Sequence, residues 1–324
     1  MRGNVLITSA GRRGVLVQVF QREAAGSLPG AQVFAGDLRP GMSAACKLAD
    51  RAFALPRVSS LDYVPVLLEL CEEHDVALVV PTIDTELQSL AESRRRFQDR
   101  GVSVAVSDLA LVEACRDKRR AEDLFGGIGI KSPRLVENPA ESDYPLFARP
   151  VGGSCSQGVR LLRSRDELLA LGPEEPQMVL NEYVDPAVYE EFTIDLYYDV
   201  EGTLKCLVPR LRLETRAGEV SKGRTTRLPE YCQLWDCFAG LRGARGCLTA
   251  QVFRHATTGE LLGIEINPRF GGGYPLSYEA GANYPGWLLR EYCRDEPLED
   301  FHDWEAGLTM LRYDGQVFVR DSAA

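Results

Sequence analysis

The sequence predicts an α/β domain with a parallel sheet over residues 1–112, followed by an α+β half over residues 113–324. The first half alternates short apolar runs with helical patterns, which is typical of a parallel, doubly wound sheet. In the second half, most strand patterns follow one another through turns, as in antiparallel hairpins. The length of 324 residues and the hydrophobic content of 45% are sufficient for two ordinary globular domains.

The first half opens with a buried-strand pattern at residues 4–8, followed by a glycine turn and a helical pattern. Further strand patterns follow in AQVFAGD, in RAFALP and in VALVVPTIDTEL, the last of which runs on into a helix. Ligands of such sheets bind at the carboxyl ends of the strands, where Asp84 and Glu86 lie. These two acids either cap the helix, with Thr82 or Asp84 as the N-cap, or contact a substrate.

The glycine turn after the first strand has some features of a dinucleotide-binding fold. It reads Gly11-x-x-Gly14, however, instead of G-x-G-x-x-G. Arg12 and Arg13 within it would crowd a dinucleotide phosphate. An NAD(P)-dependent oxidoreductase is therefore the less favoured reading of this half.

The second half begins with CRDKRRAEDLFGG, which predicts a charged helix ended by Gly126 and Gly127. YPLFARPVGGSCSQGVRLL predicts a strand, a loop and a strand, and QMVLNEYVD predicts a further strand. EEFTIDLYYDVEGTLKCLVPRLRLE predicts a hairpin that turns at Glu201 and Gly202. A helix separates it from a last hairpin, QVFRHATTGELLGIEINPR.

The composition limits the partners. A net charge of -10 and a pI near 5.0 argue against nonspecific binding to nucleic acid or to anionic membranes. Nine cysteines without a C-x-x-C pair and only three histidines disfavour a zinc site and indicate reduced thiols. The sequence shows neither a signal-peptide pattern nor a run of the roughly 20 apolar residues that a membrane span needs. We expect a cytoplasmic protein that binds neither nucleic acid nor membranes, and a homodimer is left open.

The last hairpin predicts a patch of three oxygen-bearing side chains. If its turn centres on Thr258, Gln251 lies directly across from Glu265, and Asn267 is a diagonal neighbour. The period of two puts residues 265 and 267 on one face and the isoleucines at 264 and 266 on the buried face. Carboxylate and amide oxygens suit Mg²⁺, which completes its shell with water and phosphate oxygens. Arg269 would face those phosphates; the alternative is a solvated polar face on an ordinary hairpin.

The loop in ARPVGGSCSQGVR is rich in glycine and serine. Glycines let backbone N–H groups approach phosphate oxygens, and hydroxyls add donors. Arg149 at the edge of the loop would supply a charge for one phosphate, and Lys118 in the preceding helix would supply another. Taken alone, such a loop is more often an ordinary connection.

The order of these features resembles the ATP-grasp superfamily, specifically its single-module members related to the carbamoyl-phosphate synthase large subunit and to amino-acid ligases. A cation, a glycine loop, LNEYVD, EEFTID, Gln251 and EINPR follow one another as in that family. The resemblance covers nearly the whole chain. It implies an ATP-grasp fold after a Rossmann-like preceding domain, with a small lid over about residues 113–185. It also implies ATP and Mg²⁺ as cofactors, with two ions and with Mn²⁺ as a substitute.

The resemblance further implies roles for individual residues, with two departures from the family pattern. Arg149 stands where many members have lysine, and its role in phosphate binding is expected to survive. Cys155 stands where the loop often has a third glycine, and its Cβ is expected to restrict loop closure. The implied nucleotide-binding residues are Lys118, Arg149, Gly153, Ser156, Gly158, Glu182, Val184 and Glu191. The implied metal ligands are Gln251, Glu265 and Asn267, with Arg269 facing the transferred phosphate.

The expected function is that of an ATP-dependent carboxylate–amine ligase acting on an amino acid or a related small metabolite. A carboxylate does not react with an amine at neutral pH, so ATP must first convert it into an acyl phosphate. The enzyme would form a C–N bond from a small carboxylate and a small amine and release ADP and phosphate. The alternative is a carbamoyl-phosphate synthase-like subunit, which would need a second module and an ammonia source.

A basic stretch, VPRLRLETRAGEVSKGRTTR, offers cations for the reaction. It contains Arg210, Arg212, Lys222 and Arg224 within an otherwise acidic chain. We expect Arg212 and Lys222 to help bind the carboxylate or the γ-phosphate. The alternative is a solvated basic face.

Four further residues are candidates for substrate contact. Asp84 and Glu86 would hold the ammonium group of an amino-acid substrate. Tyr274 or Asn283, in the glycine-rich stretch after the metal strand, would contact the ligand.

Overall fold

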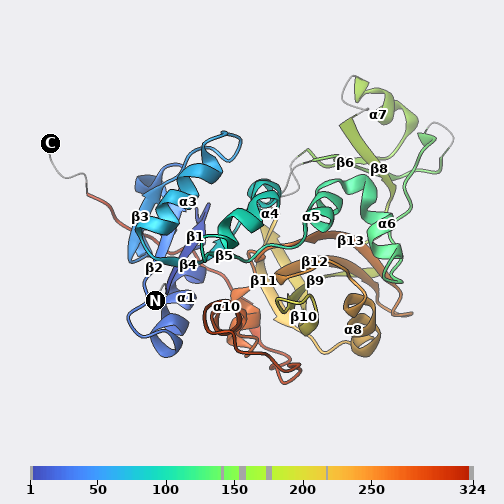
Figure 1. Ribbon diagram of the computed structural model, residues 1–324. Helices are drawn as coiled ribbons and strands as arrows, with labels where there is room; N and C mark the ends of the chain where they lie inside the picture. The colour runs from blue at the N-terminus through green and yellow to red at the C-terminus, as the bar shows by residue number, and fades with distance from the viewer. Residues whose placement is uncertain (1–2, 140–141, 153–157, 173–176, 217, 321–324) are drawn as a thin grey trace.

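The computed structural model describes residues 3–139, 142–152, 158–172, 177–216 and 218–320 (Figure 1). These residues form a five-stranded sheet, a three-stranded sheet and a six-stranded sheet, in that order along the chain. Within the described ranges, no helix has the length and apolar character needed to cross a membrane.

The five-stranded sheet is parallel throughout, as the alternating pattern predicts, and its order is β3-β2-β1-β4-β5. The strands are β1 (Asn4–Thr8), β2 (Val33–Asp37), β3 (Arg51–Ala54), β4 (Val76–Pro81) and β5 (Ser103–Val104). The connecting helices are α1 (Gly14–Ser27), η1 (Pro40–Met42), α2 (Ala44–Leu48), α3 (Tyr63–Glu73) and α4 (Asp84–Gln98). The strand order reverses between β1 and β4, and a crevice opens at their carboxyl ends.

The charged segment after β5 is divided into three short helices. These are α5 (Leu109–Arg116), η2 (Lys118–Arg120) and α6 (Ala121–Gly126). The break occurs at Asp117, whose side chain accepts a hydrogen bond from the backbone N–H of Arg119 and starts a new turn. The single helix expected here is therefore wrong. The proposed domain boundary between residues 112 and 113 falls inside α5.

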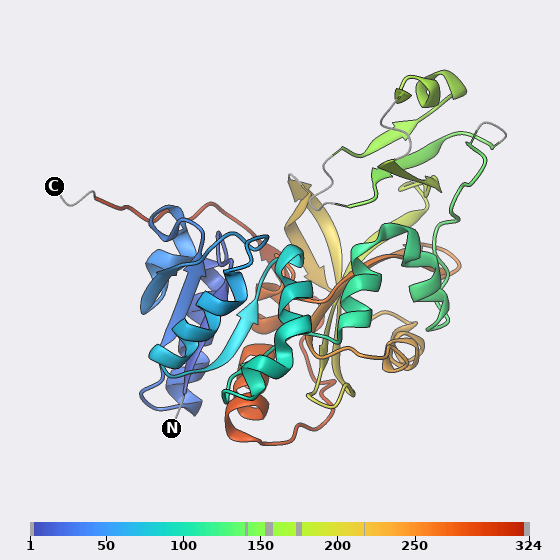
Figure 2. The same cartoon turned by 45° about the horizontal axis from the view of Figure 1, so that its top comes forward.

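The three-stranded sheet is antiparallel, in the order β7-β6-β8. Its elements are β6 (Leu146–Pro150), β7 (Arg160–Leu162), α7 (Arg165–Leu169) and β8 (Met178–Glu182). They share a small hydrophobic core of their own, which includes Leu146, Leu162 and Leu180. Figures 1 and 2 both show this green sheet standing out from the rest of the molecule.

The six-stranded sheet is antiparallel and has the order β13-β12-β9-β10-β11-β14. Both predicted hairpins, β9–β10 and β12–β13, are confirmed. The strands are β9 (Tyr189–Tyr198), β10 (Leu204–Arg216), β11 (Glu219–Thr225), β12 (Gly246–His255), β13 (Leu261–Asn267) and β14 (Thr309–Leu311). The helices of this half are α8 (Tyr231–Ala239), α9 (Pro275–Glu279) and α10 (Tyr284–Arg294).

One hydrophobic core joins the five-stranded sheet to the six-stranded sheet. It combines residues of β1 and α1 with aromatic residues of the second half, including Tyr197, Tyr274 and Tyr284. On the opposite face of the six-stranded sheet, Phe125 of α6 lies against Gly263 of β13, where a Cβ would be 2.2 Å from the ring. This close approach requires glycine and holds η2 and α6 near the last hairpin.

Candidate active site

The β12–β13 hairpin has the register that the sequence predicts at its centre. Gln251 pairs with Glu265 and Thr249 pairs with Asn267. Beyond them a bulge shifts the register, because Val252 pairs with Gly263. The extra residue, Ile264, is only half-buried, which corrects the expectation that it lies in the core, whereas Ile266 is buried as expected.

The three oxygen-bearing side chains of this hairpin lie together at a half-buried surface. The Asn267 amide donates to Glu265 Oε1 at 2.9 Å, and its Oδ1 accepts from Arg269 at 3.3 Å. The described residues contain no group of three or more His, Cys, Asp and Glu side chains that could hold a metal. The three hairpin side chains, Gln251, Glu265 and Asn267, offer one carboxylate and two amide oxygens. This donor chemistry fits Mg²⁺, which takes its other ligands from water and phosphate.

Two cations approach this carboxylate from the side of the three-stranded sheet. Arg149, at the end of β6, is buried and donates to the carbonyl oxygen of Ile264 at 3.3 Å. Lys118, in η2, donates to the carbonyl oxygen of Pro150 at 3.3 Å. Burial lowers the pKa of both cations, and the nearby Glu265 opposes that shift in each. The buried Nε of Arg149 has no hydrogen-bond partner among the described residues, so a donor remains available.

A second acid and a third cation lie on the neighbouring strands. Glu191 of β9 forms an ion pair with Arg212 of β10, at 3.3 Å between Oε1 and Nε. Burial raises the pKa of Glu191, Arg212 opposes the rise, and Glu265 adds to it. Glu265 and Glu191 therefore face a common space. Arg212 is only 9% exposed, so it does not belong to a solvated basic face.

The other basic residues of the same stretch have different surroundings. Lys222 lies 2.6 Å from Glu214 across β10 and β11 and is 47% exposed. Arg224 donates to the hydroxyl of Thr309 on the exposed edge of the sheet. Of the two cations expected to serve the reaction, Arg212 lies beside Glu191, and Lys222 is held by an acid at the rim.

Arg269 connects the hairpin to the five-stranded sheet. Its Nη2 lies 2.7 Å from Asp84 Oδ2, at the first turn of α4. The N-cap of α4 is Ile83, so capping by Thr82 or Asp84 is wrong, whereas Glu86 accepts from the N–H of Ile83 at 3.1 Å and caps the helix as one alternative expects. The Asp84 carboxylate serves instead as the partner of a site cation.

Glu86 lies in the interior, behind the cavity-lining residues Ser9 and Tyr63. Its Oε1 accepts from the backbone N–H groups of Thr82 and Ile83, and its Oε2 accepts from the hydroxyls of Ser9 and Tyr63. The residue is fully buried, and burial raises its pKa. These contacts hold the carboxyl ends of β1 and β4 together. The expected contact with the substrate is therefore not retained.

The residues expected to bind the nucleotide in the predicted lid lie partly within the described ranges. Glu182 of β8 accepts from the backbone N–H of Arg134 at 3.0 Å, and Val184 follows it at a half-buried position. Gly158 has a φ of 72° and lies against Pro150, so a side chain there would be strained. Gly153, Cys155 and Ser156 lie outside the described residues.

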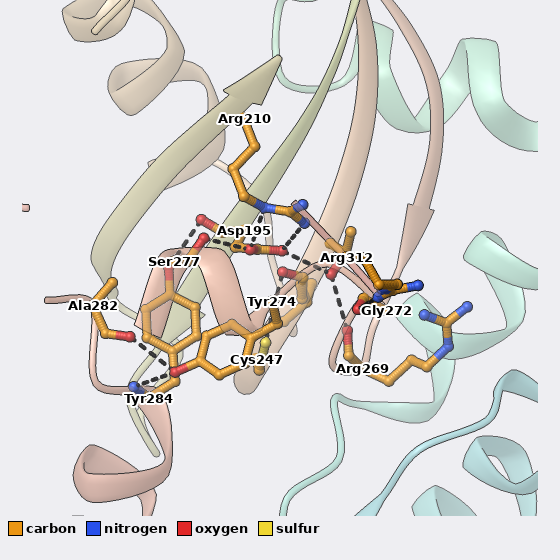
Figure 3. A network of polar contacts seen from close by, with 12 residues as sticks. Asp195, Arg210, Cys247, Arg269, Gly272, Tyr274, Ser277, Ala282, Tyr284 and Arg312 are labelled. Carbon is orange, nitrogen blue, oxygen red and sulfur yellow. Dashed lines mark hydrogen bonds and ion pairs between the residues drawn. The ribbon is translucent and has the colours of Figure 1, made fainter. Parts of the chain in front are cut away.

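A buried polar network supports the turn after β13 (Figure 3). Arg210 lies 2.7 and 2.9 Å from the two oxygens of Asp195, which also accepts from Ser277 at 2.6 Å. The Thr249 hydroxyl lies 3.3 Å from Asp195 Oδ1 and 3.2 Å from the carbonyl oxygen of Arg269. Arg210 is therefore a supporting residue of the interior, not a cation that meets the substrate.

The two residues expected to contact the ligand after β13 are also structural. Tyr274 is buried, donates to the carbonyl oxygen of Ala282 and accepts from the N–H of Tyr284. Asn283 caps α10 and donates to Glu23 at 2.7 Å. Both expectations are therefore wrong.

Sequence reasoning missed two arginines of the site, Arg13 and Arg312. Burial lowers the pKa of Arg13 to about 10, and Arg269 and Arg312 contribute to the shift. Arg13 and Arg312 both lie at Gly272, since Arg13 Nη1 would be 3.1 Å from a Cβ there and Arg312 contacts its carbonyl oxygen. Arg312 follows β14 and donates to the carbonyl oxygen of Gly272, as Figure 3 shows. The GRRG turn was a signal for Arg13, whereas no local pattern points to Arg312.

A cavity of about 590 Å³ lies in the crevice of the five-stranded sheet. Its lining includes Ser9, Asp37, Arg57 and Tyr63. The backbone of Ser9 has a φ of 49°, a conformation that residues other than glycine rarely adopt. Ile83 and Thr85, the neighbours of Asp84, line it as well. The cavity thus adjoins the Asp84–Arg269 ion pair.

Comparisons with known proteins identify the two parts of the chain. A family described as "PylC-like, N-terminal domain" matches residues 5–105. A family described as "ATP-grasp in the biosynthetic pathway with Ter operon" matches residues 174–315. Residues 174–315 therefore resemble an ATP-grasp family, and residues 5–105 resemble a PylC-like N-terminal domain.

Two relatives of this chain are 3-methyl-D-ornithine–L-lysine ligases. The one from Methanosarcina mazei is 36% identical over 133 residues, which cover 38% of this chain and 34% of that protein. The one from Methanosarcina acetivorans is 29% identical over 122 residues, which cover 38% of this chain and 31% of that protein. The matched part spans about a third of the length of these relatives.

Solved structures share the fold at low sequence identity. The biotin carboxylase domain of Hydrogenobacter thermophilus 2-oxoglutarate carboxylase, in complex with MgADP, ADP and bicarbonate, has a TM-score of 0.72 and 17% identity, covering 95% of this chain and 73% of that one. Staphylococcus aureus N5-carboxyaminoimidazole synthetase, complexed with ADP, has a TM-score of 0.69 and 15% identity, with 92% and 79% covered. The L-amino acid ligase of Bacillus licheniformis has a TM-score of 0.67 and 17% identity, with 91% and 75% covered.

Proposed function

We propose that this protein is an ATP-dependent carboxylate–amine ligase that acts through an acyl phosphate on an amino acid or a related small metabolite. The observation that carries the proposal is the convergence on Glu265 of two amide side chains from the hairpin and two cations from the side of the three-stranded sheet. The name that both relatives carry, 3-methyl-D-ornithine–L-lysine ligase, supports it.

The nucleotide would lie between the three-stranded sheet and the six-stranded sheet. Lys118 and Arg149 would bind its phosphates, and Glu191 its ribose hydroxyls. The segment of Glu182 and Val184 would hydrogen-bond the adenine edge, and the loop that includes Gly153, Ser156 and Gly158 would cover the phosphates. Mg²⁺ would be held by Gln251, Glu265 and Asn267. We propose two such ions, and Mn²⁺ would be able to replace them. Such ions neutralise the charge that spreads over the transferred phosphoryl group.

The reaction would proceed in two steps. A carboxylate oxygen attacks the γ-phosphorus of ATP, an O–P bond forms, and the bond from that phosphorus to the β,γ-bridging oxygen breaks, releasing ADP. The amine then attacks the acyl carbon, the C–O bond to phosphate breaks, and the amine nitrogen loses a proton. Arg269 and Arg212 would stabilise the charge on the transferred phosphoryl group and on the tetrahedral oxyanion, with Lys222 contributing from the rim.

The substrates would be bound on the side of the five-stranded sheet. The cavity beside Asp84 is large enough for a small metabolite, and its lining combines an acid, Asp37, with a cation, Arg57. Asp84 would hold an ammonium group if the substrate displaced Arg269 from it. The domain division stays a prediction: a preceding domain of residues 1–112 and an ATP-grasp domain of residues 113–324, with a lid over about 113–185.

The oxidoreductase alternative has one specific observation against it. The backbone N–H of Gly11, in the first glycine turn, donates to Asp37 at 2.9 Å. In a dinucleotide-binding turn such groups face the pyrophosphate. Arg13 follows in the same turn, where the dinucleotide phosphates would lie.

ADP release should be measured with a matrix of carboxylates and amines that includes bicarbonate, ammonia and NAD(P)H. A carboxylate–amine pair that is required for ADP release supports the ligase. ADP release that needs only bicarbonate and ammonia would replace it with a carbamoyl-phosphate synthase-like subunit. Hydride consumption without ATP would overturn both. A homodimer and a cytoplasmic location stay predictions from the sequence.

A further inference from the structure

Four guanidinium groups meet two carboxylates beside the Gly272 turn. Arg12 and Arg13 directly precede α1, Arg269 follows β13, and Arg312 follows β14. The acids are Asp84 and Glu219. Positive charge is therefore in excess in this cluster, within a chain whose net charge is -10. Such an excess predicts an anionic ligand.

Three of the four arginines have acidic partners. Arg269 lies 2.7 Å from Asp84, and Arg312 lies 2.9 Å from Glu219. Arg12 lies 3.5 Å from Glu219 and is 87% exposed. The Arg13 side chain differs, because it makes no hydrogen bond or ion pair with any residue that the structure describes. Only Arg13 thus keeps all of its guanidinium donors free for a ligand.

The surroundings of Arg13 make an empty site unfavourable. Burial of this half-buried charge, with Arg269 and Arg312 beside it, lowers its pKa to about 10, although Glu219 and Asp84 oppose the shift. It stays protonated at neutral pH. The α1 helix adds to the positive potential, because no side chain caps its N-terminus and its first turn has no acid. An oxyanion bound here would relieve the repulsion and fill the donors.

The position of Arg13 separates it from the phosphate-binding cations. Glu265 affects the pKa of Lys118 and of Arg149 but is not among the charges that affect Arg13, whereas Asp84 affects both Lys118 and Arg13. Its Nη1 lies against Gly272, where a Cβ would be 3.1 Å away. Arg269 lies between the phosphate-binding cations and Arg13, since it contacts both Asn267 and Asp84. Arg13 therefore faces the substrate side of the transferred phosphoryl group.

We propose that Arg13, together with Arg269, binds the carboxylate group of the substrate that is to be phosphorylated. The proposal rests on the ligase function and adds that the N-terminal domain supplies a cation to the reacting group itself. The ligand class is a small carboxylate, which becomes an acyl phosphate of higher negative charge at the same donors. Arg312 acts as a positioning residue, because its donors are used by Glu219 and by the Gly272 carbonyl.

The first test uses inorganic phosphate as the probe and the full chain with saturating MgADP, measured by isothermal titration calorimetry. Phosphate is the product that occupies the same donors. Arg13→Gln should weaken phosphate binding by about tenfold or more, and Arg13→Lys should weaken it less. The matched control is Arg22→Gln, since Arg22 lies on α1 outside this cluster, is 63% exposed and pairs with Glu279, and it should bind phosphate as the wild type does. Equal phosphate affinity in wild type and Arg13→Gln, or no phosphate binding by the wild type, would overturn the proposal.

The second test separates this inference from the function itself. In the ADP-release assay, Arg13→Gln should raise KM for the carboxylate by about tenfold or more and leave KM for ATP and for the amine within about twofold. If Arg13→Gln does not fold by circular dichroism, Arg13→Lys carries the same comparison. A KM change confined to ATP would refute the carboxylate site while the ligase function stands. Failure of every carboxylate to stimulate ADP release in the wild type would refute the function, and the Arg13-dependent phosphate titration would still decide the anion site.

Discussion

Arg269 lies 2.7 Å from Asp84 and so joins the two halves of the chain at the candidate active site. Arg269 follows the β12–β13 hairpin, and Asp84 starts α4. The pair is largely shielded, with side chains 13% and 31% exposed. It fixes the direction of a cation whose Nε, although buried, has no hydrogen-bond partner among the described residues. The first half of the chain thus takes part in shaping the proposed phosphate site.

Asp84→Asn should lower kcat for ADP release and cost about 1 kcal/mol of unfolding free energy, because Arg269 loses its ionic partner. Steady-state kinetics and urea unfolding measure the two effects. A variant whose only defect is a higher KM for the amine would instead assign Asp84 to the ammonium group of the substrate.

Glu265→Ala should abolish ADP formation and leave the fold intact by circular dichroism, because the only carboxylate of the proposed metal set is lost. The matched control is Glu260→Ala in the same hairpin, since Glu260 pairs with the exposed Lys131 at 2.6 Å. The control should keep its activity. Turnover retained by Glu265→Ala would remove the metal assignment.

Gly273→Ala should destabilise the protein by about 1–3 kcal/mol, because a Cβ there would overpack the support of the site. It would lie 2.2 Å from Arg210 Nη1 and 2.5 Å from Val220 Cγ1. Gly26→Ala in α1 is the control, since its Cβ would meet nothing within 4 Å. That control should be stabilised by about 0.5–1 kcal/mol, as measured by urea unfolding. Equal stability of the two variants would contradict the described packing.

Glu291 should make stability depend on pH. Burial raises its pKa from 4.5 to about 7, the nearby Asp199 contributes, and hydrogen bonds such as that from Tyr197 at 2.5 Å oppose the rise. The folded state therefore holds a proton that the unfolded state has lost between about pH 4.5 and pH 7, so stability falls as pH rises through this window.

The variant Glu291→Gln tests this sign. It keeps a neutral side chain at all pH values, so its Tm should gain on that of the wild type as the pH is raised from about 5 to about 8. Thermal unfolding at intervals of pH measures the difference. A constant difference across the series would show that Glu291 titrates at its usual pKa.

The register of the β12–β13 hairpin could be predicted because it depends on residues that are close together in the sequence. A turn composition between two apolar runs fixes which residues face each other, and Gln251 and Glu265 do pair. The bulge at Ile264 could not be predicted, because it accommodates contacts from distant segments, including Phe125 at Gly263 and the Arg149 bond to the Ile264 carbonyl. The local sequence pattern predicts which strands pair, but it does not predict where a bulge shifts their register.

Burial was the main limit on predicting the site. Glu86 and Tyr274 have residue types suited to substrate binding and lie near the right strand ends, yet both are buried by segments far away in the sequence. Conversely, Arg13 and Arg312 lie at opposite ends of the chain and meet only because α1 and β14 border the same turn. Neither fact is encoded in a short stretch of sequence.

The unequal distribution of hydrophobic packing has a consequence for motion. The five- and six-stranded sheets share one large core, whereas the three-stranded sheet has only a small core of its own. Local opening costs least where few apolar contacts must be broken. Backbone amides of β6, β7 and β8 should therefore exchange with deuterated water sooner than those of β1 or β9, and nucleotide entry would proceed by displacement of that small sheet while the other two stay joined.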